Sequence, residues 1–281
     1  MKKTTIIMIA TAIGGLLLIL GAMALIASFG ISIDQSPIII SDDSSESRPI
    51  AMADSIEVTQ PDDWALHVGL SSETGIEIVI SGTDTPRVEY PTDFADYITV
   101  SENDGRLRLL IGRTDSLSDQ EKAVGRACYR YVECPYPIRV VLPSSPAKIR
   151  STLSNVPVML KDASADSICL QIRGTARLDG CRLAYAMINP TGLGPNPEVH
   201  IGNTSIAALA VGERMRRLTL QSDSISTVGS LSWHSALNAD DECTLNAGGS
   251  RIGRISFSSV TDSTSFTLQT FGTVNLNSQN Q

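Results

Sequence analysis

The sequence predicts an all-β fold in which N-terminal strands and hairpins continue into a single-stranded β-solenoid, of the β-helix or β-roll kind, preceded by one N-terminal transmembrane helix. Between residues 178 and 276, apolar residues recur in pairs, and the first members of successive pairs lie 23, 19, 25 and 23 residues apart. Short alternating segments at a period near twenty are typical of stacked coils, none of which can bury its apolar face alone. Aromatic residues make up only 5% of the chain and charged residues 19%. Helix-forming runs of Ala, Leu, Glu and Lys are nearly absent after residue 35.

The first 33 residues predict a membrane anchor. Lys2 and Lys3 are followed by an uncharged run from residue 4 to residue 33, in which residues 5–29 are long enough for a spanning helix of about 20 residues. A cleaved signal peptide is the alternative, because Ala22-Met23-Ala24 has the form of a cleavage site. The apolar run, however, continues beyond the roughly 7–15 residues of a cleavable core. We therefore favour an uncleaved signal anchor that leaves residues 34–281 outside the cytoplasm.

Residues 34–149 predict a linker and then a region of strands. Residues 34–55 lack apolar periodicity and indicate a polar linker. Residues 56–149 indicate β-hairpins and strands, with alternating segments at 64–70, 75–80, 97–100, 107–111 and 137–142. The strongest turn signal is Asn103-Asp104-Gly105, since Asp-Gly tolerates positive φ angles. Residues 112–136 interrupt this pattern as a longer polar loop.

Residues 150–281 contain the predicted solenoid repeats. Side chains at equivalent places in successive coils should stack in two interior columns. The first predicted column comprises Leu178, Ile201, Leu220, Leu245 and Leu268. The second comprises Leu183, Ile206, Ile225, Ile252 and Val274.

The distribution of charge argues against a nucleic-acid partner. The net charge is −8, and residues 34–149 carry 20 acidic and 10 basic side chains. Affinity for nucleic acid comes largely from cationic side chains that neutralise phosphates. The densest basic group is Arg214, Arg216 and Arg217, which is too small for such a surface.

The order of segments resembles a known bacterial family. Gly75-Ile-Glu-Ile-Val-Ile80 is followed by Arg87-Val-Glu-Tyr90, an Asp-Gly-x-Leu hairpin at 104–107, Ile-Arg-Val-Val-Leu-Pro at 138–143, and serine-rich repeats. This order is similar to the autotransporter-adhesin head domains, also called head GIN domains. The resemblance spans roughly residues 56–277 and implies an exported envelope protein with a β-solenoid or β-roll, and no catalytic residues to transfer. The long uncleaved N-terminal run and the loop at 112–136 depart from the commoner members.

Five cysteines lie in a segment predicted to be exported, where disulfides can form. Cys128 and Cys134 are six residues apart in the polar loop and form a candidate disulfide, although sequence does not fix the required geometry. Cys169 and Cys181 could pair between neighbouring coils, but Cys169 alternates out of phase with its apolar neighbours. Cys243 keeps the phase of Leu245 and should point inward. The odd number leaves at least one thiol without an intramolecular disulfide.

No cofactor or metal site is predicted. His67, His200 and His234 lack the spacing of metal ligands, and His200 should face solvent because it alternates with Val199 and Ile201. Asp240, Asp241 and Glu242 form the densest acidic group in the repeats. An exposed turn explains this group more simply than a catalytic pair or a calcium site, since it has neither a defined mutual geometry nor the regular Gly-Asp spacing of calcium-binding coils.

Trp233 is a candidate for stacking on a glycan, because an indole exposed on a solenoid face could contact a sugar ring. The alternative is a corner residue that covers the core, which is the usual place of a large apolar side chain.

From these features we expect a membrane-anchored, non-enzymatic, adhesin-like module of the cell envelope that binds an envelope partner, a surface partner or a glycan. The first alternative is a structural or sensing periplasmic ectodomain, which an uncleaved anchor would suit. The second is a β-helix carbohydrate-active enzyme, which would need a clustered acid and base that the sequence does not reveal.

Overall fold

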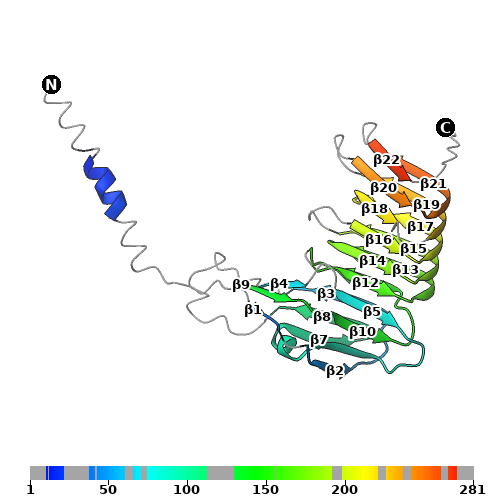
Figure 1. Ribbon diagram of the computed structural model, residues 1–281, viewed down its shortest axis with the longest axis horizontal. Coiled ribbons are helices and arrows are strands. Elements are labelled where there is room, and N and C mark those ends of the chain that lie inside the picture. Colours follow the sequence, from blue (N-terminus) through cyan, green and yellow to red (C-terminus); the bar gives the residue numbers. More distant parts are fainter. Residues whose placement is uncertain are drawn as a thin grey trace. The chain divides into compact units, whose positions relative to one another are not determined.

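The computed structural model describes residues 11, 13–21, 38–41, 43–60, 66–70, 75–112, 130–154, 156–191, 198–220, 226–236, 242–260 and 265–270. The chain divides into two compact units, Met1–Ser36 and Pro37–Gln281, which are described separately. In the first unit, residues 11 and 13–21 are helical (Figure 1). Within the described part of the chain, no helix has both the length and the apolar character needed to cross a membrane. Most of the anchor predicted over residues 1–33 lies outside the described residues.

The second unit is built from β-strands, as predicted, and its largest sheet has ten strands (Figure 1). The strand order is β2-β6-β10-β5-β12-β14-β16-β18-β20-β22. The strand bounds are β2 (Ser45–Pro49), β6 (Arg87–Pro91), β10 (Ile138–Leu142), β5 (Ile76–Ile80), β12 (Val158–Lys161), β14 (Thr175–Asp179), β16 (Glu198–Gly202), β18 (Arg217–Leu220), β20 (Glu242–Gly248) and β22 (Ser265–Thr270).

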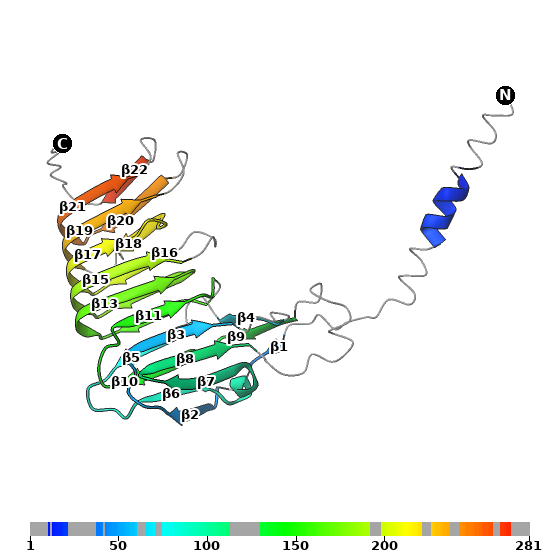
Figure 2. The ribbon, with the colours of Figure 1, turned by 180° about the vertical axis from the view of Figure 1, so that it is seen from behind.

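A second sheet has nine strands, which are labelled in Figure 2, where the molecule is seen from behind. The strand order is β21-β19-β17-β15-β13-β11-β3-β8-β7. The strand bounds are β21 (Arg251–Ser259), β19 (Thr227–Ser235), β17 (Ser205–Val211), β15 (Arg182–Pro190), β13 (Ser164–Ile172), β11 (Lys148–Ser151), β3 (Ser55–Thr59), β8 (Arg106–Ile111) and β7 (Ile98–Asn103). A small third sheet has the order β1-β9-β4, from Ile38–Ile39, Arg130–Cys134 and Leu66–Leu70, and η1 (Thr92–Tyr97) is a 3-10 helix.

From β12 onward the chain alternates between the two large sheets. Each even-numbered strand from β12 to β22 lies in the ten-stranded sheet, and each odd-numbered strand from β13 to β21 lies in the nine-stranded sheet. Successive members of each sheet pair in parallel. Each coil therefore contributes one strand to each sheet, which is the stacking that a solenoid requires.

The first predicted column is present but is broken once. Leu178 lies opposite Ile201, and Ile201 lies opposite Leu220. The register then shifts, because Leu245 lies opposite Leu218 and not Leu220. Leu245 and Leu268 are opposite each other, as predicted. The predicted column is thus two shorter columns offset by two residues.

The second predicted column is correct at its start and wrong at its middle member. Leu183 lies opposite Ile206, which lies opposite Val228, which lies opposite Ile252. Val228 therefore holds the place that was predicted for Ile225. Ile225 and Val274 lie outside the described residues.

The N-terminal strands confirm one predicted hairpin and correct the predicted linker. β7 and β8 pair antiparallel around a turn in which Asp104 and Gly105 have φ angles of 48° and 73°, so the predicted Asp-Gly hairpin is confirmed. β4 and β5 follow each other in the chain but belong to different sheets. Part of the predicted linker is β2, which pairs antiparallel with β6. Its side chains are all exposed, so it has no apolar periodicity to reveal it.

The predicted boundary at 149/150 falls within β11. This strand pairs in parallel with β3 on one side and with β13 on the other. The N-terminal strands and the coils therefore share the same two sheets.

Candidate binding surface

One row on the outer face of the nine-stranded sheet is uncharged along the coils. Charged residues such as Arg182 and Arg254 lie on other rows of the same face. The uncharged row is in register across five strands and consists of Cys169, Met187, Ala210, Ser232 and Ser256. All five are partly or fully exposed, while the alternate positions of the same strands, such as Leu209 and Leu231, are buried. Alternate side chains of a strand point to opposite faces of the sheet, so these five residues form one outward row, and none of them is charged.

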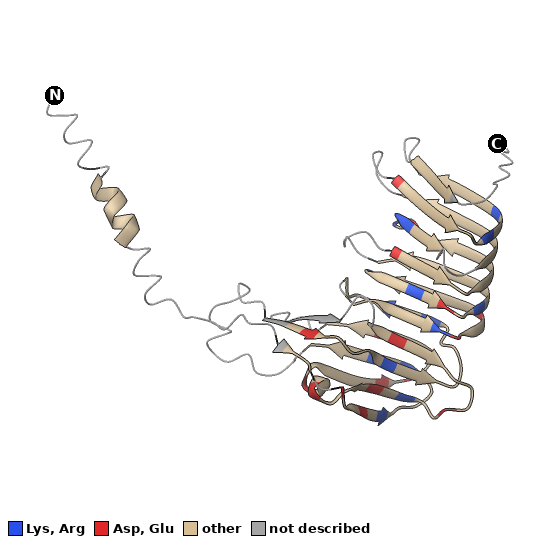
Figure 3. Cartoon of the chain, in the orientation of Figure 1, with Lys and Arg blue, Asp and Glu red and all other residues tan. Residues whose placement is uncertain are grey.

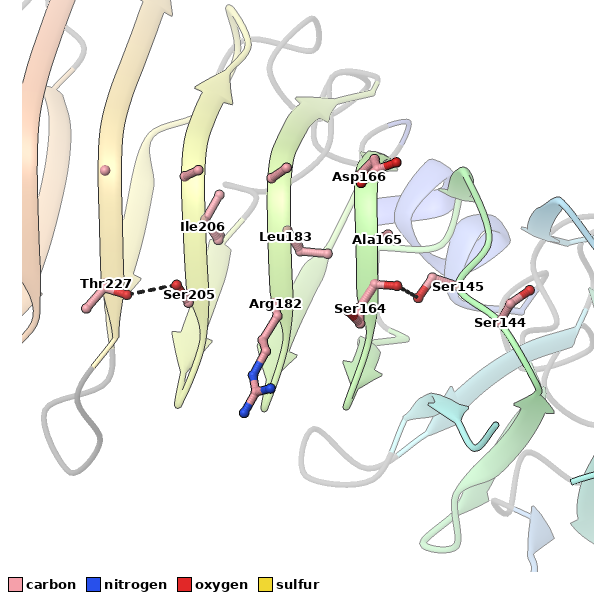
Figure 4. A pocket seen from close by; sticks show the side chains of 13 residues that line it. Ser144, Ser145, Ser164, Ala165, Asp166, Arg182, Leu183, Ser205, Ile206 and Thr227 are labelled. Carbon is pink, nitrogen blue, oxygen red and sulfur yellow. Dashed lines mark hydrogen bonds between the residues drawn. The ribbon is translucent and has the colours of Figure 1, made fainter. Parts of the chain in front are cut away.

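A groove of about 880 Å³ lies at the start of these strands. It crosses β13, β15, β17 and β19, as Figure 4 shows. The lining residues are Ser144, Ser145, Ser164, Ala165, Asp166, Arg182, Leu183, Ala184, Ser205, Ile206, Ala207, Thr227 and Gly229. Hydroxyl groups occur along one side of the groove, where Thr227 donates to the Ser205 hydroxyl at 3.0 Å and Ser145 donates to the Ser164 carbonyl oxygen at 3.2 Å.

Small residues bring the strands close together in this groove. Ala184 and Tyr185 are successive residues of β15 and are both exposed, whereas a regular strand would expose only one of them, so the strand bends locally here. At the equivalent place in β19, a Cβ atom on Gly229 would lie 2.5 Å from the carbonyl oxygen of Ala207. A larger residue at position 229 would therefore push the strands apart.

Tyr185 follows the groove residue Ala184 and is 41% exposed. Its cross-strand neighbours are Ser167 and Ala208, which have small side chains. An aromatic ring between two such neighbours keeps much of its surface in contact with water. The sequence analysis did not identify Tyr185, because a single Tyr in an alternating strand has no distinctive motif.

The outer face of the ten-stranded sheet is different, since ion pairs cross it. Figure 3 marks the charged residues on the strands. The Glu77 carboxylate accepts hydrogen bonds from Arg139 Nε at 2.9 Å and from Lys161 Nζ at 2.7 Å. Burial by itself raises the pKa of Glu77, but the hydrogen bonds and charges of Lys161 and Arg139 outweigh it and lower the pKa below 4.5. Glu77 is thus an ionised, nearly buried carboxylate that joins β5 to β10 and to the first coil.

A second charged group on this sheet surrounds His200. Arg217 donates to Glu198 at 2.6 Å, and His200 Nε2 lies 3.6 Å from the other oxygen of Glu198. Burial and the charge of Arg177 lower the pKa of His200 against the opposing effect of Glu198. The imidazole is therefore neutral at pH 7, and it lies on the outer side of the sheet, as predicted, but half-buried among these charges.

Trp233 does not lie on an outer face. Its side chain is fully buried, and its ring packs edge-on against Phe266 and Phe257 with centroid distances of 5.8 and 6.4 Å. Sugar stacking by Trp233, one of the two roles considered, requires an exposed ring and is contradicted by this burial. The alternation in β19 explains the result, because Trp233 has the same phase as the buried Leu231.

The predicted Cys128–Cys134 disulfide stays a prediction, because Cys128 lies outside the described residues. Cys134 is buried, and its thiol donates to the carbonyl oxygen of Tyr136 at 3.5 Å. Cys169 and Cys181 are not joined in a disulfide. Cys243 is buried in the interior, as its phase predicts.

The other candidate residues do not converge. Asp240 and Asp241 lie outside the described residues, and Glu242 is exposed at the start of β20. His67 lies on β4, and the Nδ1 atom of the exposed His234 is 2.9 Å from the Ser258 hydroxyl. Within the described ranges, no three His, Cys, Asp or Glu side chains are grouped in a way that could hold a metal ion.

The sequence analysis also missed the polar row of the groove. This row consists of Arg182, Ser205 and Thr227, which are the first residues of β15, β17 and β19, and each comes directly before a buried residue of the second column. The signal was present in the sequence, but it is visible only when Val228 and not Ile225 is placed in the second column.

Comparison with known proteins finds similar solved structures at low identity. No family model matches the chain, and no curated protein matches it. A "putative adhesin" from Bacteroides fragilis has a TM-score of 0.44 and 13% identity, with 83% of this chain and 100% of that chain covered. A "putative adhesin" from Parabacteroides distasonis has a TM-score of 0.35 and 12% identity, with 82% and 99% covered. A "putative lipid binding protein" from the same species has a TM-score of 0.30 and 12% identity, with 84% and 100% covered.

Proposed function

We propose that this chain is a non-enzymatic, exported binding module of the bacterial cell envelope, anchored by its N-terminal segment, that holds a partner on the outer face of the nine-stranded sheet. The observation that carries the proposal is the contrast between the two outer faces. On the nine-stranded sheet, the coils carry a row without a charge beside a groove of about 880 Å³, and the ion pair between Arg150 and Glu57 lies before them, on β11 and β3. On the ten-stranded sheet, ion pairs reach the coils themselves.

The contrast matters because a partner must displace water from the surface that it covers. Charged side chains are expensive to desolvate unless they find new partners, and the centres of protein interfaces are accordingly poor in charge. Small uncharged residues such as Ala210 and Ser232 lose little on desolvation. A flat sheet of this kind also holds its geometry before binding, which lowers the entropic cost of association.

The location in the envelope is supported by the sequence. Residues 4–33 form an uncharged run behind two lysines, and the order of the later segments resembles exported head domains. An adhesin-like role is the form of binding that fits such a module.

Capture of envelope components tests the proposal. The full chain, in a detergent without a sugar headgroup, is immobilised and incubated with the cell's own envelope polysaccharides, its membrane proteins and host-type glycans. We expect retention of one class without release of sugar product. Product release would contradict the non-enzymatic role, and an absence of retention in every fraction would favour the structural or sensing ectodomain.

A matched pair of variants locates the surface. Ala210→Arg places a charge in the middle of the nine-stranded face, and Thr219→Arg places the same charge on the ten-stranded face. Both positions are partly exposed and lie in successive strands, β17 and β18. We expect Ala210→Arg to reduce retention at least tenfold and Thr219→Arg to leave it unchanged. Equal effects of the two variants would contradict the assignment of the face.

A further inference from the structure

We infer that the groove across β13, β15, β17 and β19 binds a neutral, linear oligosaccharide, with Tyr185 as the ring on which a sugar stacks. This inference rests on the proposed function, in that it names the ligand class of the same face. It replaces the buried Trp233 with an aromatic residue that is 41% exposed.

The polar groups along the groove repeat at the spacing of the strands. Arg182, Ser205 and Thr227 occupy equivalent register positions in β15, β17 and β19, and neighbouring strands lie about 4.7–4.9 Å apart. This repeat runs along the axis of the coils. A linear glycan laid along that axis presents one sugar unit after another to the same row, and hydroxyl groups such as those of Ser205 and Thr227 can both donate to and accept from sugar hydroxyls.

The charge of the groove favours a neutral ligand. Among the described residues that line it, one is acidic, Asp166, and one is basic, Arg182. Their charges cancel, and an anionic chain that followed the whole groove would have to pass the Asp166 carboxylate, which is exposed. Carboxylate and guanidinium groups both form hydrogen bonds with sugar hydroxyls, so each can serve a neutral chain without a counter-charge on it.

Tyr185 supplies the apolar contact that hydroxyl groups cannot. A sugar ring has one face rich in C–H groups, and an aromatic ring offers a rigid apolar surface together with a polar hydroxyl at its tip. Tyr185 follows the groove residue Ala184, and its register neighbours Ser167 and Ala208 are too small to cover the ring. Tyr185 thus lies beside the groove, next to its lining residue Ala184, and a glycan in the groove can stack on this ring while it forms hydrogen bonds with the row of polar side chains.

An extended peptide fits this place less well. Peptides that bind to sheets usually add a strand at an edge, where backbone N–H and C=O groups are unpaired. β13, β15, β17 and β19 are interior strands, and each pairs with a neighbour on both sides. Their backbone groups are already used, so recognition in the groove depends on side chains.

Titration of the full chain with defined oligosaccharides tests the inference. The probes are neutral linear hexasaccharides of glucose, mannose, galactose and N-acetylglucosamine, together with a hexasaccharide of uronic acid, in a detergent without a sugar headgroup. We expect at least one neutral probe to bind and the uronic-acid probe to bind at least tenfold more weakly. Failure of every neutral probe to bind, or tighter binding of the uronic-acid probe, would overturn the inference.

Variants at the groove then assign the contact. Tyr185→Ala should raise the Kd about five- to tenfold, as the loss of one aromatic contact implies. Tyr185→Phe should keep the Kd within about twofold of that of the unmodified chain. Thr219→Arg, on the opposite sheet, is the control and should bind as the unmodified chain does. Thermal unfolding of each variant shows whether it is folded. If Tyr185→Ala does not fold, Ser205→Ala, a smaller change in the polar row of the groove, is measured in its place and should also weaken binding. Unchanged binding in folded Tyr185→Ala would overturn the inference.

The outcome for the ligand is separable from the outcome for the proposed function. One set of results would refute the glycan and keep the binding module: a protein or lipid is captured, Ala210→Arg abolishes that capture, and no oligosaccharide binds. If neither capture nor titration detects a partner, both fail.

Discussion

Replacement of Trp233 tests whether the indole is a structural part of the last coils. The side chain has no exposed surface and contacts the rings of Phe257 and Phe266. A buried aromatic side chain removes roughly 150–250 Å² from water, which at about 25 cal/mol per Å² corresponds to about 4–6 kcal/mol as an upper bound. Phe257 and Phe266 are only partly buried and can move into part of the space. We therefore expect Trp233→Ala to lower the free energy of unfolding by about 3–5 kcal/mol.

Trp233→Phe separates the ring from its N–H group. The indole Nε1 atom is buried and has no hydrogen-bond partner within the described part of the chain. Such a group has lost its hydration without compensation, so its removal offsets part of the cost of the smaller ring. We expect Trp233→Phe to cost about 1–2 kcal/mol, less than Trp233→Ala, because the phenyl ring leaves a smaller cavity than the methyl group does.

Urea unfolding followed by far-ultraviolet circular dichroism measures both variants, since tryptophan fluorescence changes with the substitution itself. The midpoint should fall strongly for Trp233→Ala and slightly for Trp233→Phe, with an unchanged dependence of free energy on urea. A Trp233→Ala protein as stable as the unmodified chain would refute the core role. A Trp233→Phe protein as unstable as Trp233→Ala would show that the N–H group has a partner.

Three further predictions concern single side chains. The lowered pKa of Glu77 means that its stabilisation is complete above pH 4.5 and is lost as the pH falls below that value. Glu77→Gln, which leaves Lys161 and Arg139 without the carboxylate, should therefore cost about 1–3 kcal/mol at pH 7, and the difference from the unmodified chain in urea midpoint should shrink at pH 3.5. Thr204→Val removes the acceptor of the Cys181 N–H group, at 3.2 Å, and should lower the free energy of unfolding by about 1–3 kcal/mol in the same assay. Burial raises the pKa of Cys181 to about 11, so at pH 8 a thiol reagent should modify Cys181 in unfolded protein much faster than in native protein, as mass spectrometry would show.

The coil period and the inward face of the strands could be predicted from the sequence, because both follow from the spacing of apolar residues. Leu178, Ile201 and Leu220 lie opposite one another as expected. The Asp104-Gly105 turn was predictable for a separate reason, since few residue pairs adopt two successive positive φ angles. These signals are local or strictly periodic.

The offset between β18 and β20 could not be predicted in this way. A one-residue slip would turn every side chain to the other face, but a two-residue slip keeps each side chain on the same face. Leu218 and Leu220 are both buried, so either could lie opposite Leu245, and apolar alternation does not distinguish them. In the structure, Leu218 lies opposite Leu245. Leu220 therefore lies two residues further along β18, beyond the last residue that pairs with β20.

The proposed binding surface could not be predicted for a related reason. Trp233 is a large aromatic residue among small ones in the sequence, but the phase of β19 places it inside. Tyr185 faces outward in β15 next to Ala184, which is also exposed, so the alternation of inward and outward residues is interrupted there. An irregularity of this kind alters which neighbouring residues face outward, and it is not encoded in a strict alternation.

The two outer faces differ in where their charges lie. Glu77 connects β10 of the N-terminal strands to β12 of the first coil through Arg139 and Lys161, so the charges of the ten-stranded sheet hold the two parts of the fold together. These charges keep their hydration and their partners, and a ligand that covered them would have to replace both. The nine-stranded sheet also has an ion pair, between Arg150 of β11 and Glu57 of β3, but its outer row from Cys169 to Ser256 carries no charge. A partner that covered only this row would leave these ion pairs in place.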